Sequence, residues 1–336
     1  MKTSTKALST TKALPTPVTG KPARAKLTPA ERKLKWKRVA RSFTKNWQVY
    51  LLLLPVVAYY VIFHYAPMYG LQIAFRDYNP LEGFWGSTWV GLKHFTRFFS
   101  SYNAGRLISN TLILSLLSLA INFPLTIIFA LMLNEVRSLR FKKTVQTVTY
   151  APHFISVVVV VSMIILFTHA DRGIINFAIK AMGGEAIRFM ERPEWFRPLY
   201  IISGIWQDLG FSAIIYIAAL AGIDQELIEA ACVDGAGRFR RIWHINIPGI
   251  LPTVVTMLIL NVGSIMSVGF EKIFLMQNEL NKETSDVIAT YTYKVGIINN
   301  QMSFSSAIGL FNSAINCVLL LTVNAISKKL SDTSLW

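Results

Sequence analysis

The chain has 336 residues, of which 53% are hydrophobic and only 15% are charged. Soluble domains carry about 25% charged residues, so this composition argues against a soluble globular protein and favours a membrane protein. The two cysteines, Cys232 and Cys317, are far apart and suggest neither a disulfide framework nor a metal site. The sequence contains no P-loop, no metal-binding spacing and no hydrolase grouping, so we predict no catalytic or metal-ligating residue.

The formal charge of +16 is concentrated at the N-terminus. Residues 1–46 hold 13 Lys and Arg and one acid, Glu31, and so carry +12 of that charge. We expect a basic, largely disordered cytoplasmic tail here, in which residues 29–45 have the pattern of a surface helix. A nucleic-acid-binding arm has a similar charge. However, basic residues just before an apolar span are better explained by the positive-inside rule and by attraction to anionic lipid, so we expect no nucleic acid as partner.

The rest of the chain, residues 47–336, has the pattern of one transmembrane domain. We predict an all-α membrane protein with six transmembrane helices, because a lone span in lipid must satisfy its own backbone hydrogen bonds. The predicted spans cover about residues 49–75, 107–133, 144–168, 199–221, 249–276 and 304–326.

The Lys and Arg residues near the ends of the spans predict the orientation. The basic tail places the N-terminus in the cytoplasm, and an even number of spans returns the C-terminus to the same side. The loop after the second span and the loop after the fourth span then also face the cytoplasm. These segments carry Arg137, Arg140, Lys142, Lys143, Arg238, Arg240, Arg241, Lys328 and Lys329.

The loop between the fourth and fifth spans, residues 222–248, has a helix–turn–helix pattern. Residues 223–231 place apolar side chains on one helix face. Gly235 interrupts this pattern and permits a sharp turn. Residues 238–243 form a second amphipathic piece, and we expect Pro248 to end it before the fifth span.

The spacing within this loop is specific. Glu229-Ala230-Ala231 is followed after three residues by Gly235, and after nine more by Ile245-Asn246-Ile247-Pro248. This spacing resembles the EAA signature of permease subunits of bacterial ABC importers, EAA-x3-G-x9-I-x-L-P, with Ile247 where Leu is usual. An ordinary amphipathic connector has no need for four fixed points over twenty residues.

The resemblance covers the chain from about residue 48 to the C-terminus. It is closest to permeases of carbohydrate-uptake importers, and within them to the lipo-/polysaccharide branch. The stretches that carry it are residues 151–156 (APHFIS), 268–275 (VGFEKIFL), 286–291 (DVIATY), 307–313 (AIGLFNS) and 334–336 (SLW).

The resemblance implies a type I ABC importer permease fold with a maltose-permease-like core, in the bacterial inner membrane. It implies a heterodimer with a second homologous permease, two ATPase subunits, and an extracytoplasmic solute-binding protein that delivers an oligo- or polysaccharide, which in this branch can contain uronate. This chain would bind no cofactor, because ATP and Mg would be bound by the ATPases. Loop 222–248 would be the cytoplasmic coupling loop, with the ATPase-coupling residues Glu229, Ala230, Ala231, Asp234, Gly235 and Gly237.

Polar residues inside the predicted spans are candidates for the substrate pathway, because such groups are costly in lipid. The candidates are Gln207, Asp208, Phe211, Tyr216, Asn261, Ser264 and Ser267. Each has a second interpretation. The serines and Asn261 could make only interhelical hydrogen bonds, Asp208 could form a charge pair, and the nearby His153 could be purely structural. Asp234 is as well explained as a turn residue as by a partner contact.

Two other classes of protein remain open from the residues alone. A membrane-embedded enzyme acting on sugars or lipids would need clusters of acids or His at a membrane face, and the sequence shows none. A non-transporting membrane scaffold would leave the polar positions 261, 264 and 267 unexplained.

Overall fold

The computed structural model describes residues 45–331, and the predicted tail up to residue 44 lies outside this range. The chain divides into two parts, residues 1–68 and 69–336, which we describe separately. The helices are α2 (Trp47–Tyr60), α3 (Ala66–Met68), α4 (Gly83–Gly86), α5 (Lys93–Phe99), α6 (Ala104–Asn134), α7 (Leu139–Tyr150), α8 (Val157–Phe167), α9 (Ile174–Ala181), α10 (Pro193–Ser212), α11 (Ile214–Ala221), α12 (Gln225–Val233), α13 (Arg238–Arg241), α14 (Ile247–Gly263), α15 (Phe270–Met276), α16 (Lys282–Ser285), α17 (Ile288–Tyr293) and α18 (Met302–Ser331).

Short turns and one small sheet complete the secondary structure. Three 3-10 turns cover Tyr69–Phe75, Ala151–Phe154 and Phe189–Glu191, and three π turns cover Val61–Tyr65, Ile242–Asn246 and Lys294–Ile298. Strands β1 (Arg76–Asp77) and β2 (Thr88–Trp89) pair antiparallel, with Arg76 opposite Trp89.

Within residues 45–331, five helical segments are long and apolar enough to cross a membrane. They are Trp47–Phe75, Ala104–Asn134, Pro193–Ala221, Arg238–Gly263 and Met302–Lys329. A sixth candidate is the bent pair of Leu139–Phe154 and Val157–Phe167. The mainly helical architecture with six apolar segments is therefore as predicted, although two of the segments differ from the prediction.

The first part of the chain contributes one apolar helix. None of the residues of α2 is buried, and Leu52 and Trp47 are among its exposed apolar side chains. Such an all-round apolar surface suits contact with lipid. The helix continues through the π turn Val61–Tyr65 into α3.

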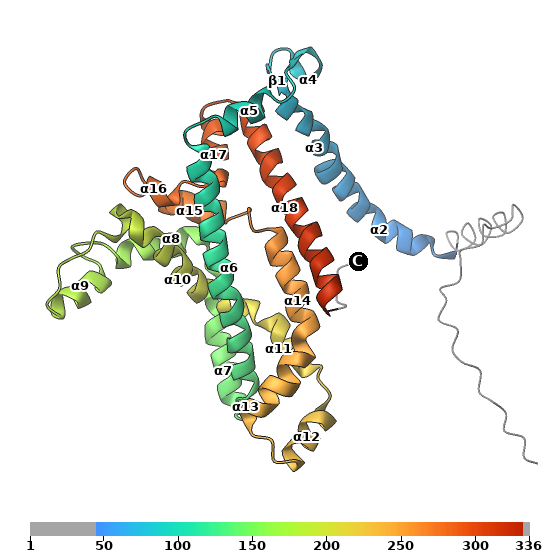
Figure 1. Ribbon diagram of the computed structural model, residues 1–336, viewed down its shortest axis with the longest axis vertical. Coiled ribbons are helices and arrows are strands. Elements are labelled where there is room, and N and C mark those ends of the chain that lie inside the picture. The colour runs from blue at the N-terminus through green and yellow to red at the C-terminus, as the bar shows by residue number, and fades with distance from the viewer. Residues whose placement is uncertain (1–44, 332–336) are drawn as a thin grey trace, which may run out of the picture. The chain divides into compact units, whose positions relative to one another are not determined.

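The second part packs its helices around three apolar clusters. The first cluster lies near α5 and α17 and contains Phe98, Leu107 and Ile308. A second cluster joins α6, α8, α10 and α15, and the third joins α6, α11 and α14 near loop 222–248. Figure 1 shows α14 and α18 lying side by side, with α12 and α13 at one end of the bundle and α5 and α17 at the other.

The third predicted span is not one straight helix. Its two halves, α7 and α8, meet at an angle of 98°. Pro152 lies in the 3-10 turn that ends α7, and Ile155 and Ser156 adopt extended conformations that redirect the chain. A proline lacks the N–H that a continuing helix needs, and the Ser156 side chain instead caps α8 by accepting from the Val159 N–H. The predicted third span, residues 144–168, is thus a bent pair of helices rather than one straight helix.

The fifth predicted span differs at both of its ends. We expected Pro248 to separate the amphipathic piece from the span, but Arg238–Gly263 is one continuous helical segment. The π turn Ile242–Asn246 precedes Pro248, and such a turn accommodates a residue that cannot donate a backbone hydrogen bond. At its other end the helix stops at Gly263, not near residue 276, and residues 264–269 are non-helical.

The non-helical segment after α14 is satisfied by side chains of α18. Asn316 Oδ1 accepts from the Met266 N–H at 2.9 Å, and Asn312 Nδ2 donates to the Met266 carbonyl at 3.2 Å. Irregular backbone at membrane depth is tolerated only where protein groups or water replace the lost hydrogen bonds. The two asparagines therefore explain why this helix can end inside the bundle.

We predict that Gly210→Ala destabilises the fold, because α10 and α7 are in close contact at this position. A Cβ at residue 210 would lie 2.4 Å from the Thr149 carbonyl oxygen, which is backbone and cannot easily yield. We expect a cost of about 1–3 kcal/mol and a lower thermal midpoint in detergent. Gly105→Ala is the matched control, since a Cβ there meets nothing within 4 Å. A wild-type midpoint for Gly210→Ala would contradict the close contact.

Candidate functional site

The helix breaks surround a large cavity, lined by both apolar and polar side chains, in the second part of the chain. The cavity has a volume of about 1360 Å³ and is bordered by α6, α10, α11 and α14 and by both non-helical segments. All seven predicted pathway residues line it, namely Gln207, Asp208, Phe211, Tyr216, Asn261, Ser264 and Ser267. The structure thus brings together residues that the sequence places on two different spans.

Asp208 and His153 are hydrogen-bonded to each other on the cavity wall. His153 Nδ1 lies 2.9 Å from Asp208 Oδ1, and both side chains are partly exposed. The His153 ring stacks on Phe211, with centroids 3.9 Å apart and an interplanar angle of 6°. The contact of Asp208 with His153 has the geometry that a charge pair would need, and the charge-pair interpretation of Asp208 stays a prediction. The pair and its aromatic partner form a flat platform with both apolar and hydrogen-bonding character.

Gln207 and Tyr216 are buried parts of the wall. The Gln207 Nε2 donates to the Ile155 carbonyl at 3.1 Å, which satisfies backbone at the break between α7 and α8. Tyr216 is only 3% exposed and packs with Ala130 and Ile250. Both residues shape the wall of the cavity.

The polar positions at the end of α14 are only partly a helical stripe. Asn261 lies in α14 and donates to the Met257 carbonyl at 2.7 Å, whereas Ser264 and Ser267 follow the last helical residue. Ser264 donates to backbone carbonyls one turn earlier, and Ser267 accepts from Asn316 at 2.9 Å. The interhelical hydrogen bond expected as one interpretation exists for Ser267, and all three residues still line the cavity.

Sequence reasoning missed Lys272. This lysine, in α15, lines the cavity and is 8% exposed. Its Nζ donates to the Tyr200 carbonyl at 3.3 Å and lies 5.1 Å from the centroid of the Tyr200 ring. The signal was present, because a charged residue within a predicted span is itself a candidate for function.

Two polar atoms of α6 also lie at the cavity wall without a partner among the described residues. Ser118 Oγ and Asn122 Oδ1 are buried and have no hydrogen-bond partner within the described residues. Both residues line the cavity and lie one helical turn apart. Buried polar atoms without a partner are uncommon in native structures, so these two have unused hydrogen-bonding capacity at the cavity wall.

Loop 222–248 is a two-helix hairpin, with α12 capped by Asp224. Gly235 has φ +74°, where a side chain is strained. The Ala236 N–H donates to the Ala231 carbonyl at 2.8 Å and the Gly235 N–H donates to the Cys232 carbonyl at 3.1 Å. These two bonds form a Schellman motif, which ends α12 and reverses the chain. Gly237 has an extended backbone without positive φ.

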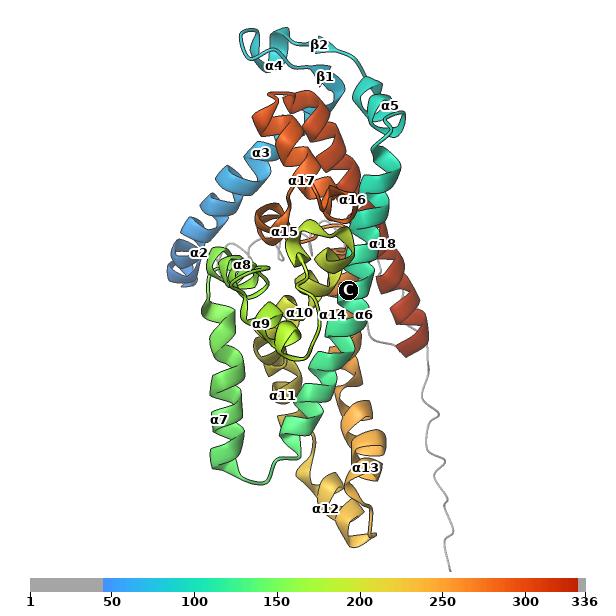
Figure 2. The ribbon, with the colours of Figure 1, turned by 90° about the vertical axis from the view of Figure 1, so that its left-hand side faces the viewer.

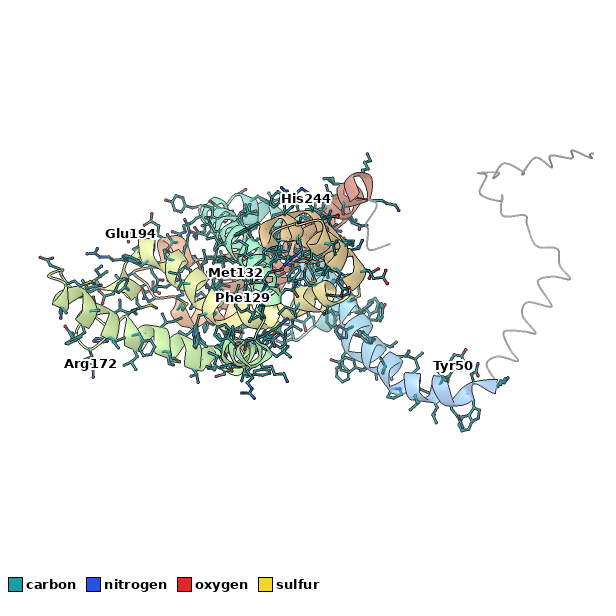
Figure 3. The ribbon with its side chains drawn as sticks, turned by 90° about the horizontal axis from the view of Figure 1, so that it is seen from below. Tyr50, Phe129, Met132, Arg172, Glu194 and His244 are labelled. Carbon is teal, nitrogen blue, oxygen red and sulfur yellow. The ribbon has the colours of Figure 1, made fainter. Side chains whose placement is uncertain are left out.

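The surface of this hairpin is apolar at its tip. Val233 is 88% exposed and Phe239 is 89% exposed, and Trp243 is also exposed. Glu229, Ala230 and Asp234 are exposed as well. Figure 3 views the molecule from the end that carries the hairpin, where His244 is labelled.

Arg241 connects the hairpin to itself and to α6. Its guanidinium lies 3.7 Å from the Glu135 carboxylate at the end of α6, and both side chains are about four-fifths buried. Its Nη1 also donates to Cys232 Sγ at 2.9 Å and reaches the Ala236 carbonyl at 3.5 Å. Figure 2 shows the α6–α7 connection and the hairpin at the same end of the bundle. Nothing in the local sequence marks this contact.

The chain is similar to known transport proteins over most of its length. Residues 122–332 match the family described as the binding-protein-dependent transport system inner membrane component. Protein LplB of Bacillus subtilis (strain 168) is 46% identical over 288 residues, which are 86% of this chain and 91% of that protein. The polygalacturonan/rhamnogalacturonan transport system permease protein YteP of the same organism is 45% identical over 91% of this chain and 95% of its own length.

Solved structures give the same result for the fold. A chain of a bacterial ABC transporter involved in the import of the acidic polysaccharide alginate is 40% identical, with a TM-score of 0.81, over 88% of this chain and 99% of that chain. A chain of a bacterial alginate ABC transporter in complex with an alginate pentasaccharide-bound periplasmic protein is also 40% identical and matches with a TM-score of 0.82 over 89% of this chain and 100% of that chain. The predicted type I importer permease fold is confirmed.

The family match covers well over half of the chain. Both relatives share enough sequence identity, over most of their length, to belong to the same family as this chain. This membership makes the chain a non-catalytic transport subunit, so the two alternatives of an enzyme and of a non-transporting scaffold are wrong. The chain belongs to the family of inner membrane components of binding-protein-dependent transport systems, and it is an integral permease subunit of an ABC importer.

Proposed function

We propose that this permease forms, with a second homologous permease, the pathway for an acidic oligo- or polysaccharide that contains uronate. An extracytoplasmic binding protein delivers the saccharide. The observation that carries the proposal is the similarity, over about nine tenths of the chain, to a permease named for polygalacturonan and to an importer of alginate. The polar and aromatic wall of the cavity supports it, because saccharides are bound by hydrogen-bonding side chains and by ring faces.

The proposed orientation has both termini and loop 222–248 in the cytoplasm. The Lys and Arg pattern supports it, since basic residues gather in the tail, in the loop after α6, in α13 and at the end of α18. The placement of the α6–α7 connection beside the hairpin is consistent with it, because both segments are basic and lie at one end of the bundle (Figure 2). The domain division into residues 1–46 and 47–336 stays a prediction.

In the proposed mechanism, loop 222–248 is seated in a cleft of one of two ATPase subunits, which bind ATP and Mg. This chain itself binds no cofactor. Closure of the ATPases moves the hairpin as a rigid body, and the continuous segment Arg238–Gly263 carries the motion to the cavity. The exposed apolar tip at Val233 and Phe239 supports docking onto a partner, because such side chains are otherwise unfavourable in water.

The direct test is reconstitution of the complete transporter, with its second permease, ATPases and binding protein, in proteoliposomes. The proposal predicts that a binding protein loaded with an oligogalacturonide stimulates ATP hydrolysis and uptake of the saccharide. A neutral oligosaccharide of the same length is the comparison. Stimulation by the neutral saccharide alone would show that the proposed acidic substrate is wrong.

Gly235→Val should separate ATP hydrolysis from uptake. A β-branched residue at φ +74° is strained and would distort the turn of the hairpin. We expect normal membrane abundance and at least a tenfold loss of uptake per ATP hydrolysed. The matched control is Gly183→Val, which introduces the same kind of strain at φ +86° outside the loop. Equal losses in both variants would count against a role in coupling.

The contact of Arg241 with Glu135 should also contribute to coupling. Arg241→Glu leaves two carboxylates close together and releases the hairpin from α6, so we expect a several-fold loss of uptake per ATP. The double variant Glu135→Arg with Arg241→Glu restores the attraction, with a coupling energy of about 0.5–1 kcal/mol. The measurement is the four-member cycle of uptake rates. A double variant no better than the worse single variant would argue against this ion pair.

A further inference from the structure

Lys272 is a buried ammonium without an ion-pair partner. Its side chain reaches the cavity from α15, and its residue is 8% exposed. Within residues 45–331, no carboxylate forms an ion pair with it. Its hydrogen bond to the Tyr200 carbonyl uses one of three donors. Burying an ammonium in this way is unfavourable unless an anion compensates it.

No other charged group around the cavity forms an ion pair with Lys272 within residues 45–331. Asp208 attracts Lys272 electrostatically, but its carboxylate is hydrogen-bonded to His153 at 2.9 Å and not to Lys272. Glu271, the residue before Lys272 on α15, also lines the cavity. Its side chain is exposed and forms no ion pair within the described residues. Among the described residues that line the cavity, Lys272 is the single Lys or Arg side chain.

The surroundings of Lys272 leave space for a ligand beside its ammonium. Gly204 of α10 faces it, and a Cβ added there would lie 3.7 Å from Nζ. The Tyr200 ring supports the ammonium from another side. On α6, the same cavity holds the unpartnered Ser118 Oγ and Asn122 Oδ1, which suit sugar hydroxyls. A cation and neutral hydrogen-bonding groups therefore face one space.

We propose that Lys272 is the specificity-determining residue of the cavity, whose ammonium pairs with the carboxylates of a uronate-containing saccharide as it passes. This inference rests on the proposed function and adds to it the residue that distinguishes an acidic saccharide from a neutral one. A single cation suits transport, because successive carboxylates can each pair with it without being held by several charges at once. Tyr200 is a positioning residue that keeps the ammonium at the wall.

The test uses the complete reconstituted transporter and two matched probes, tetragalacturonate and its fully methyl-esterified form, which has the same rings without the charge. Uptake is measured at saturating binding protein, and the fraction of binding protein loaded with each probe is determined separately. The variants are Lys272→Gln, Lys272→Met and Lys272→Arg. The control is Lys180→Gln, an exposed lysine of α9 that does not line the cavity.

We expect Lys272→Gln and Lys272→Met to lower uptake of the acid at least tenfold, which corresponds to about 1.4 kcal/mol, and to leave uptake of the ester within twofold. Lys272→Arg should keep most of the preference for the acid. The ratio of acid to ester is decisive, because a merely structural role would lower both rates together. Lys272→Gln and Lys272→Met both remove the charge but differ in polarity, so the test remains possible if one of them fails to assemble into the transporter.

Two results would overturn the inference in distinguishable ways. If the wild type takes up the acid and the Lys272 variants do so equally well, or lose acid and ester in parallel, the role of Lys272 is wrong and the proposed function stands. If the wild type takes up the ester and not the acid, the proposed acidic substrate fails and this inference fails with it.

Discussion

The structure depends on one constraint, that backbone hydrogen-bonding groups inside a membrane must be satisfied by the protein. Two helices of this chain break within the bundle, after α7 and after α14. At each break, side chains from a neighbouring helix supply the missing partners. Gln207 of α10 bonds the Ile155 carbonyl, and Asn312 and Asn316 of α18 bond the two backbone groups of Met266.

These repaired breaks make room for the cavity. A bundle of six straight apolar helices would pack side chain to side chain and leave little space for a polar cargo. Here the chain turns through 98° between α7 and α8 and leaves its helix at Gly263, so polar backbone and side chains face one volume of about 1360 Å³. The groups that repair the breaks and the groups proposed to meet the saccharide are consequently neighbours.

The same arrangement connects the cavity to loop 222–248. The helical segment Arg238–Gly263 begins in the hairpin and ends at the break beside the cavity. The Schellman turn at Gly235 and the contacts of Arg241 make the hairpin stiff. A displacement of the hairpin would therefore reach the non-helical segment 264–269 through a continuous helix, and this segment can change conformation without the loss of helical hydrogen bonds.

Much of this could be predicted from local sequence. The six apolar segments, the hairpin, the glycine at the turn and seven of the residues that line the cavity all follow from periodicity, from the cost of polar groups in lipid and from the EAA spacing. The breaks could not be located, because Asn312 and Asn316, which permit the end of α14, lie on another helix. Lys272 could have been identified, because it is a charged residue within the predicted fifth span. The contact of Glu135 with Arg241 could not, because it is purely tertiary.

The central claim is that loop 222–248 and the helix it begins move as one body when a partner hydrolyses ATP. Electron cryomicroscopy of the assembled transporter, with and without trapped ATP, tests it most directly. The account predicts the hairpin seated against an ATPase in both states, with Arg238–Gly263 displaced together with it and the backbone change confined to residues 264–269. A hairpin on the opposite face from the ATPases, or a helix that stays fixed while the hairpin moves, would contradict it.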